Sequence, residues 1–282
     1  MPQKTAYVTG GASGIGRAVA ELLVSRGVRV AIADMNLEGA RSAAESLSPT
    51  SGKAATVTAY ELDAADWDSQ VSVFEQVVRE FGRVDYVYPI AGIGERKSIP
   101  NDPKAAAFVK PDLSVLDVDL YGFIYTTSLA IQQMRRQEKD EQGFRGKIAV
   151  VASVCGFYCA PTLPIYTAAK HGVIGFVRSF GKYLPEESIT LNAVCPNVVR
   201  TNISTSAFYE DLESKGLLTP MKPVMDAFAQ FLDGDISGEC LEAGPKGNLV
   251  RRAPAEHLDP ESAVVMEMLY ERGHALHQPP KA

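Results

Sequence analysis

The sequence predicts an open α/β fold, with a doubly wound parallel sheet and helices on both faces of a single domain. Short β-rich runs alternate with longer helical segments through the first two thirds of the chain. Strands of a parallel sheet are covered on both faces, so their sequences are nearly continuously apolar. The β-rich runs of this chain have that character. A chain of 282 residues, 46% apolar and 22% charged, is large enough to bury one substantial core.

The predicted elements follow this alternation from the N-terminus. The strands are "KTAYVTG", "VRVAIAD", "AATVTAYELD", "RVDYVYPIAG", "GKIAVVAS" and "ITLNAVCP". Helices are expected to begin near Ile15, Leu37 and Trp67, a long helix covers about Leu113 to Gln137, and another holds "TLPIYTAAKHGVIGF". The predicted dinucleotide-binding domain is 1–245.

Two regions depart from the alternation. The segment 197–223 is irregular and rich in Ser and Thr, and its apolar residues suit a mobile lid over an apolar ligand, with a surface loop as the alternative. Those residues are Phe208, Tyr209, Leu217, Leu218 and Met221. The segment 246–282 is predicted to be an extension that packs on the surface or on a partner subunit.

Charge and composition narrow the class of partner to small molecules. A net charge of -6 and a pI near 5.4 argue against the basic face that nucleic acid or an anionic membrane requires. We find neither a targeting segment nor an apolar run of membrane-spanning length, and we expect a cytoplasmic protein. The four cysteines are interpreted as buried thiols. His274 and His277 have no further ligand nearby, so no metal is predicted.

A glycine-rich stretch, "TGGASGIGRA", lies between the first strand and the first helix, with Gly10, Gly14 and Gly16 in the turn. Glycine lets the backbone approach a pyrophosphate, and the following helix N-terminus offers free amides. Asp34 ends the second strand, where a carboxylate accepts hydrogen bonds from ribose hydroxyls and repels a 2′-phosphate. The pattern predicts NAD in preference to NADP. The alternative is a tight turn with an incidental aspartate.

Tyr166 and Lys170 are one helical turn apart and therefore lie on one helix face. Ser153 ends the fifth strand listed above, at the sheet edge where ligands bind in open α/β folds. A phenol is a poor base at neutral pH, but a neighbouring ammonium favours the phenolate. Ser153 would donate a hydrogen bond to the reacting oxygen. The three residues predict a dehydrogenase site with Tyr166 as acid and base.

As a set, "TGGASGIG", Asp34, "ELDAAD", Ser153 with Tyr166 and Lys170, and "CPNVVRT" resemble the short-chain dehydrogenase/reductase family over about residues 4–245. Within it, Asp34 and "ISGECLEAGPKG" look most like the 15-hydroxyprostaglandin dehydrogenase branch. The resemblance implies about seven strands and a homodimer or homotetramer that pairs the helix from Leu113 and the helix holding Tyr166. It implies a cofactor site made of Gly10, Ser13, Gly14, Ile15, Gly16, Asp34, Asp63, Ala64, Ala91, Tyr166, Lys170, Val199 and Thr201.

Three positions depart from the family pattern. Ile90 replaces the asparagine after the fourth strand, Asp119 replaces the asparagine that completes the catalytic tetrad, and Asn197 replaces a glycine. We expect the Asp119 charge to oppose the effect of Lys170 on the phenol.

The predicted function is NAD-dependent hydride transfer to or from a secondary alcohol or ketone of a mostly apolar substrate. Phe157 and Tyr158 would line its pocket, or serve only in packing. The alternatives are a non-redox cyclase or isomerase on the same fold, and a dinucleotide-binding regulatory protein.

Overall fold

A computed structural model of the chain describes residues 3–48, 56–97 and 99–277. Its main unit, Met1–Arg252, is built on one sheet with the strand order β3-β2-β1-β4-β5-β6-β7-β8. The strands are β1 Thr5–Thr9, β2 Arg29–Asp34, β3 Val57–Glu61, β4 Tyr86–Pro89, β5 Gly146–Val151, β6 Ile189–Pro196, β7 Cys240–Ala243 and β8 Leu249–Arg251. The first seven pair in parallel, and β8 pairs antiparallel to β7. The doubly wound fold is confirmed, with eight strands in place of seven.

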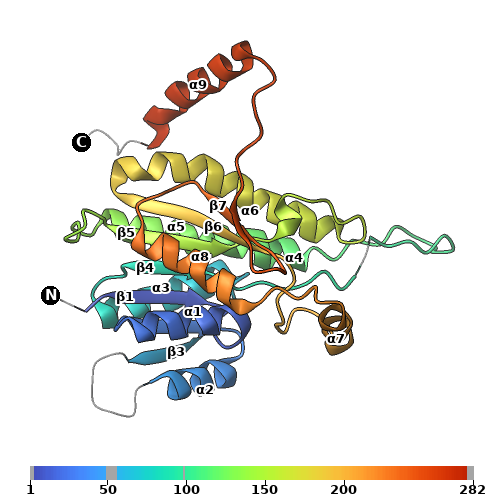
Figure 1. The fold of residues 1–282 in the computed structure, drawn as a ribbon, viewed down its shortest axis with the longest axis horizontal. Coiled ribbons are helices and arrows are strands. Elements are labelled where there is room, and N and C mark those ends of the chain that lie inside the picture. Colours follow the sequence, from blue (N-terminus) through green and yellow to red (C-terminus); the bar gives the residue numbers. More distant parts are fainter. Residues whose placement is uncertain (1–2, 49–55, 98, 278–282) are drawn as a thin grey trace. The chain divides into compact units, whose positions relative to one another are not determined.

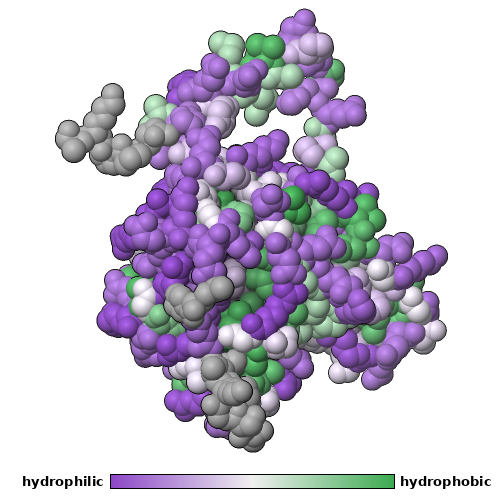
Figure 2. Space-filling model, turned by 60° about the vertical axis from the view of Figure 1, so that its left-hand side comes forward, coloured by the Kyte–Doolittle hydropathy of each residue, from purple (hydrophilic) through white to green (hydrophobic). Residues whose placement is uncertain are grey.

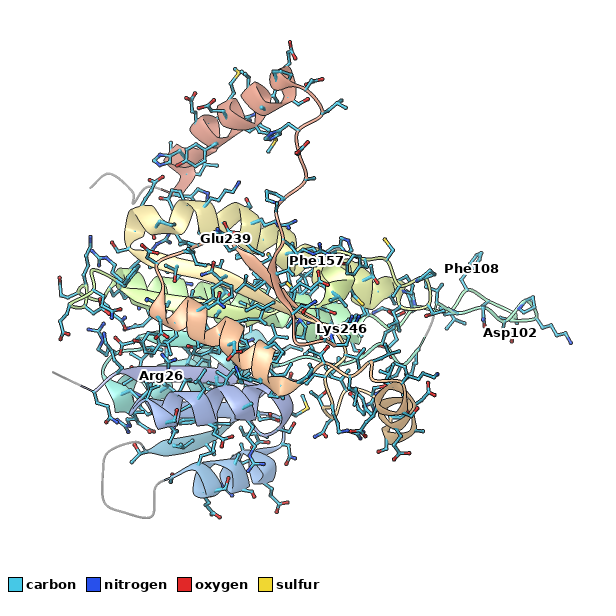
Figure 3. All side chains as sticks on the ribbon, in the orientation of Figure 1. Arg26, Asp102, Phe108, Phe157, Glu239 and Lys246 are labelled. Atoms are coloured by element: carbon cyan, nitrogen blue, oxygen red, sulfur yellow. The ribbon has the colours of Figure 1, made fainter. Side chains whose placement is uncertain are left out.

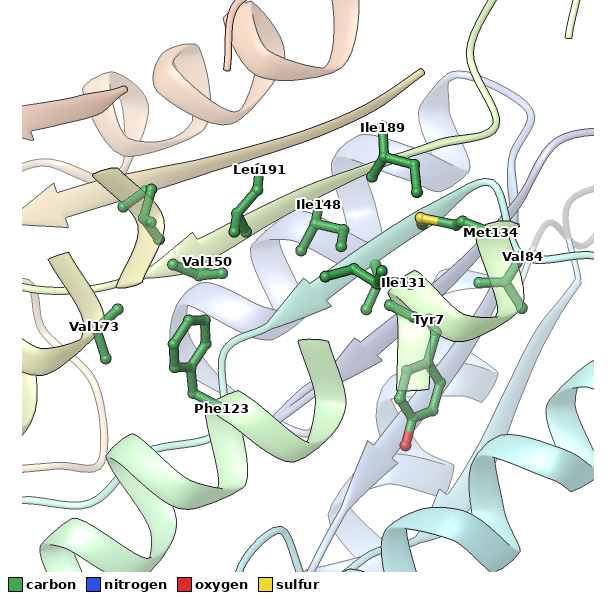
Figure 4. Close-up of a cluster of buried hydrophobic side chains, with 14 of the residues drawn as sticks. Tyr7, Val84, Phe123, Ile131, Met134, Ile148, Val150, Val173, Ile189 and Leu191 are labelled. Carbon is green, nitrogen blue, oxygen red and sulfur yellow. The ribbon is translucent and has the colours of Figure 1, made fainter. Parts of the chain in front are cut away.

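Helices cover both faces of the sheet (Figure 1). The helices of the main unit are α1 Gly14–Ser25, α2 Leu37–Leu47, α3 Trp67–Phe81, α4 Ser114–Leu116, α5 Phe123–Arg135, α6 Pro164–Tyr183, α7 Ser206–Ser214 and α8 Met221–Asp233, and α9 Pro260–His274 belongs to the second unit. Apolar residues of α3, α5 and α6 form one core layer, in which Phe123, Ile131 and Val173 face strand residues such as Ile148 (Figure 4). Helices α1, α2 and α8 pack on the other face. This arrangement explains why the parallel strands are apolar along their whole length.

The long helix predicted from Leu113 to Gln137 has a π-helical turn in it. Helix α4 passes into the turn Asp117–Gly122, and α5 continues from Phe123 to Arg135. Gly122 lies against the β3–α3 loop, where a Cβ would come within 2.6 Å of the Ala64 carbonyl oxygen. Such turns are frequent at functional sites. Here the turn carries the buried Asp119.

The main unit extends beyond residue 245 to Arg252, because β8 completes the sheet. The second unit, Ala253–Ala282, contains α9, whose described residues are all at least partly exposed, among them Val264, Met268 and Leu269. Two adjacent prolines of the predicted extension, Pro279 and Pro280, lie outside the described residues. Hydrophilic residues cover most of the face shown in Figure 2.

Two connections carry most of the irregular structure. Between β4 and α4 a long excursion has neither helix nor strand in its described residues, and Figure 3 labels Asp102 and the fully exposed Phe108 on it. The segment 197–223, predicted to be irregular, contains α7 and the start of α8.

Candidate functional site

The glycine-rich turn has the backbone geometry that its sequence predicts. Gly10 and Gly14 take φ values of +71° and +53°, in the left-handed region that favours glycine. A Cβ at Gly16 would lie 2.1 Å from the carbonyl oxygen of Gly10, so only glycine fits there. Ser13 makes no side-chain capping bond to α1, which leaves orphan amides in the first turn of the helix.

A cavity of about 440 Å³ opens beside this turn. Asp34 lies on its wall and accepts backbone N–H bonds from Ala12 (3.0 Å) and Asn36 (2.9 Å) through its two carboxylate oxygens. The glycine turn, the free amides of α1 and the carboxylate of Asp34 together fit a dinucleotide. The other lining residues are Gly10, Ser13, Gly14, Ile15, Gly16, Ile90, Ala91, Gly92, Ile93, Gly94, Arg96, Val151, Thr201, Asn202 and Ile203.

Five residues predicted for the cofactor do not line this cavity, and two of them, Tyr166 and Lys170, belong to the group described below. Asp63 and Ala64 lie in the loop after β3, where the Asp63 carboxylate accepts the N–H of Ala65 at 2.9 Å. Val199 lines a neighbouring cavity. Conversely, sequence reasoning missed Arg96, which no local pattern connects to the glycine turn.

The candidate catalytic residues converge from two elements. Helix α6 carries Tyr166 and Lys170, and the Lys170 Nζ lies 5.3 Å from the centroid of the Tyr166 ring. Ser153 follows β5 and accepts the N–H of Cys155 at 3.1 Å, capping a short 3₁₀ turn. Ser153 and Lys170 are both buried.

Asp119 connects three segments around this group. Its Oδ2 lies 3.0 Å from the Lys170 Nζ, and both side chains are almost completely buried. Its Oδ1 accepts the N–H of Ile93, in the loop after β4, at 2.8 Å. The loop, the π-helical turn and α6 are therefore joined through one carboxylate.

The charges act on Tyr166 in opposite directions. Burial raises the pKa of the phenol, the Lys170 ammonium lowers it, the Asp119 carboxylate raises it, and a hydrogen bond with Ser153 lowers it. The net result is a Tyr166 pKa above its ordinary value. The directions expected for Lys170 and Asp119 both appear here, and burial has the largest influence on the pKa of the phenol.

Lys170 responds to the same carboxylate. Burial lowers its pKa, but attraction to Asp119 and the phenol, together with the hydrogen bond to Asp119, raises the pKa above its ordinary value. The ammonium thus remains charged inside the protein.

The other two departures from the family pattern, and the two aromatic residues predicted for the substrate pocket, have the following contacts. Asn197 accepts the backbone N–H of Val198 at 2.8 Å through its Oδ1, and Ile90 lines the glycine-turn cavity. Ile90 donates its backbone N–H to the Thr9 hydroxyl at 3.1 Å, and its side chain packs against the core on the α1 and α8 face. The guanidinium of Arg178 lies over the Phe157 ring, with its Cζ 5.3 Å from the ring centroid. The Tyr158 hydroxyl donates to the Glu242 carboxylate at 3.2 Å.

The predicted lid is anchored next to the glycine-turn cavity. Tyr209 of α7 is buried, and its hydroxyl lies 3.2 Å from the Thr201 Oγ1. Leu218 and Met221 line a cavity of about 550 Å³, and Leu217 lines another of about 340 Å³. Phe208 is exposed.

Within the described ranges, no helix is long and apolar enough to cross a membrane.

Known proteins share this sequence pattern and fold. A family model described as short chain dehydrogenase matches residues 4–211. The short-chain dehydrogenase/reductase prx7 of Penicillium rubens is 31% identical over 251 residues, 86% of this chain and 84% of its own. The human 15-hydroxyprostaglandin dehydrogenase [NAD(+)] is 33% identical over 210 residues, 74% of this chain and 73% of its own. The 3-oxoacyl-[acyl-carrier-protein] reductase of Bos taurus is 33% identical over 214 residues, which are 76% of this chain and 83% of its own.

A solved structure of a putative short-chain alcohol dehydrogenase from Sinorhizobium meliloti superposes with a TM-score of 0.72 at 23% identity, covering 87% of this chain and 96% of its own. That likeness shows the fold. The family match and the relatives above 30% identity show more: the chain belongs to the short-chain dehydrogenase/reductase family, oxidoreductases that bind nicotinamide cofactors and act on small molecules.

Proposed function

We propose that this chain is an NAD-dependent oxidoreductase that interconverts a secondary alcohol and the ketone of a mostly apolar substrate. The observation that carries the proposal is the convergence of Ser153, Tyr166 and Lys170 on the elements that follow β5. When bound, the cofactor accepts or supplies the hydride.

Each of these residues has a separate part in the proton chemistry. The Tyr166 hydroxyl takes the proton of the substrate alcohol, or returns it to the ketone oxygen. Lys170 favours the phenolate form, and Asp119 holds the ammonium in place at the cost of part of that effect. Ser153 donates a hydrogen bond to the reacting oxygen.

The cofactor and substrate classes rest on two further features. The Asp34 carboxylate on the cavity wall would accept hydrogen bonds from the ribose hydroxyls and repel a 2′-phosphate. Both effects favour NAD over NADP. Leu217, Leu218 and Met221 line the cavities beside the lid segment, and their apolar side chains suit a mostly apolar ligand.

The test is turnover across a panel of secondary alcohols with NAD and of ketones with NADH, followed by absorbance of the reduced nicotinamide. We expect turnover that is lost in Tyr166→Phe and retained in Tyr125→Phe, a matched change elsewhere in the chain. Cofactor binding without hydride transfer across the whole panel would favour the non-redox or regulatory alternative.

We also propose that the chain forms a dimer or tetramer through α5 and α6. Gly175 on α6 is exposed with nothing within 4 Å of its Cβ position, so a second helix could approach closely there. Light scattering should give a dimer or tetramer, and Gly175→Leu should shift it towards monomer. A monomer at micromolar concentration contradicts this.

A further inference from the structure

A carboxylate from a distant part of the sequence holds the first turn of the helix that carries Tyr166. The Glu95 Oε2 accepts the backbone N–H of Tyr166 at 2.8 Å, across 71 positions of sequence. Glu95 lies at the start of the excursion between β4 and α4 and is partly buried. The contact therefore ties the loop after β4 to the third residue of α6.

Helix α6 has no local substitute for this contact. Its N-cap residue is Leu163, which has no side-chain oxygen, and its first turn contains no acidic residue. Helices α2, α3, α7 and α9 are instead capped by the residue directly before each of them. Those residues are Asn36, Asp66, Thr205 and Asp259. A helix start without a local cap leaves amides that need an outside acceptor.

Glu95 lies in the chain between two residues of the glycine-turn cavity. Gly94 and Arg96, its two neighbours in the chain, line that cavity, while the Glu95 carboxylate turns towards α6. Ile93, in the same loop, donates its N–H to Asp119, which pairs with Lys170. The loop after β4 is thus attached to α6 by two carboxylates, one near Lys170 and one at Tyr166.

We propose that Glu95 is a positioning residue for Tyr166, fixing the phenol relative to the cavity wall; its catalytic part rests on the proposed function. Hydride and proton transfer need the reacting groups aligned, and a misplacement of about 1 Å can lower a rate on the order of a hundredfold. The hydrogen bond requires an acceptor, which an amide supplies as well as a carboxylate.

The test compares Glu95→Ala with Glu95→Gln, and uses Asp66→Ala as the matched loss of a helix cap at α3. We expect Glu95→Ala to lower kcat about tenfold or more while Glu95→Gln stays within about twofold, with NAD affinity unchanged in both. Asp66→Ala should lose similar thermal stability and keep its kcat. If Glu95→Ala does not fold, Glu95→Asp, which withdraws the carboxylate by one methylene, should give an intermediate loss.

Amide hydrogen exchange gives a readout that does not depend on activity. In protein without cofactor or substrate, the Tyr166 amide should exchange faster in Glu95→Ala and at the wild-type rate in Glu95→Gln. Unchanged kcat in Glu95→Ala, an equal loss in Glu95→Gln, or an equal loss in Asp66→Ala overturns the proposal. If wild type transfers no hydride yet the exchange result holds, the anchor stands and the proposed function fails.

Discussion

The candidate nucleotide site and the candidate catalytic site of this molecule, called here the nucleotide half and the catalytic half, differ in the groups that form them. Around β1, α1 and β2, the site consists of backbone: two glycines in the left-handed region, an uncapped helix start and one acid that itself holds two amides. Around β5 and α6, the site consists of buried side chains whose charges oppose one another.

The difference teaches where each half is sensitive. A backbone site fails when an added atom blocks a close approach, whatever the charge of that atom. A site built of charged side chains responds to a change of charge of similar size, such as Asp to Asn, mainly through the pKa values of its members. Mutations of the two halves should therefore separate affinity for the cofactor from the rate and pH dependence of turnover.

The largest effect is expected on the catalytic side. Tyr166→Phe removes the proton acceptor and little contact surface, so kcat should fall by about a thousandfold while NAD affinity stays within about twofold. Steady-state turnover and fluorescence titration measure the two quantities. Wild-type turnover in the Phe variant contradicts the assigned role.

The matching change in the nucleotide half is Gly16→Ala. The new Cβ would meet the Gly10 carbonyl oxygen at 2.1 Å, so the turn must shift and NAD affinity should fall about a hundredfold. Gly273→Ala, where nothing lies within 4 Å, is the control and should bind normally. If both variants titrate like wild type, backbone approach does not govern this half.

A smaller effect concerns the choice between cofactors. Wild type should prefer NAD over NADP by at least about tenfold, or about 1.4 kcal/mol, because Asp34 repels a 2′-phosphate. Asp34→Asn keeps an oxygen acceptor and removes the charge, and it should narrow the preference. Equal titration of both cofactors by wild type would show that the carboxylate serves only Ala12 and Asn36.

The smallest effect is a displacement of the pH-rate profile. Asp119 raises the pKa of Tyr166, so Asp119→Asn should lower that pKa and move the rise in alcohol oxidation to lower pH by about one unit. Asp117→Asn removes the same charge from an exposed position of the same turn and should leave the profile in place. An unmoved profile in Asp119→Asn refutes the charge argument.

Local patterns predicted most of the fold and the backbone geometry of the glycine turn. The strand runs and the glycine turn depend on neighbours within a few residues, and α1, α2 and α3 begin at or next to the predicted residues. The shared helix face of Tyr166 and Lys170 was predicted in the same way, because it follows from helix periodicity.

Long-range contacts escaped prediction. The sequence does not reveal that Asp119 reaches Lys170 directly, that Glu95 holds Tyr166, or that burial dominates the pKa of the phenol. The π-helical turn also escaped, since its apolar pattern continues that of an ordinary helix. Each of these depends on segments that meet only after the chain has folded.

The short antiparallel strand β8 has a consequence for how copies of this chain can meet. A parallel sheet ending at β7 would present a row of unpaired backbone groups, a template for edge-to-edge joining. β8 occupies that edge with Leu249–Arg251, and the guanidinium of Arg251 is paired with Glu239 at 2.7 Å. A three-residue strand with a charged end is a poor template for further strands. On this side of the molecule, continuous sheet growth between copies is discouraged, and association is left to helices.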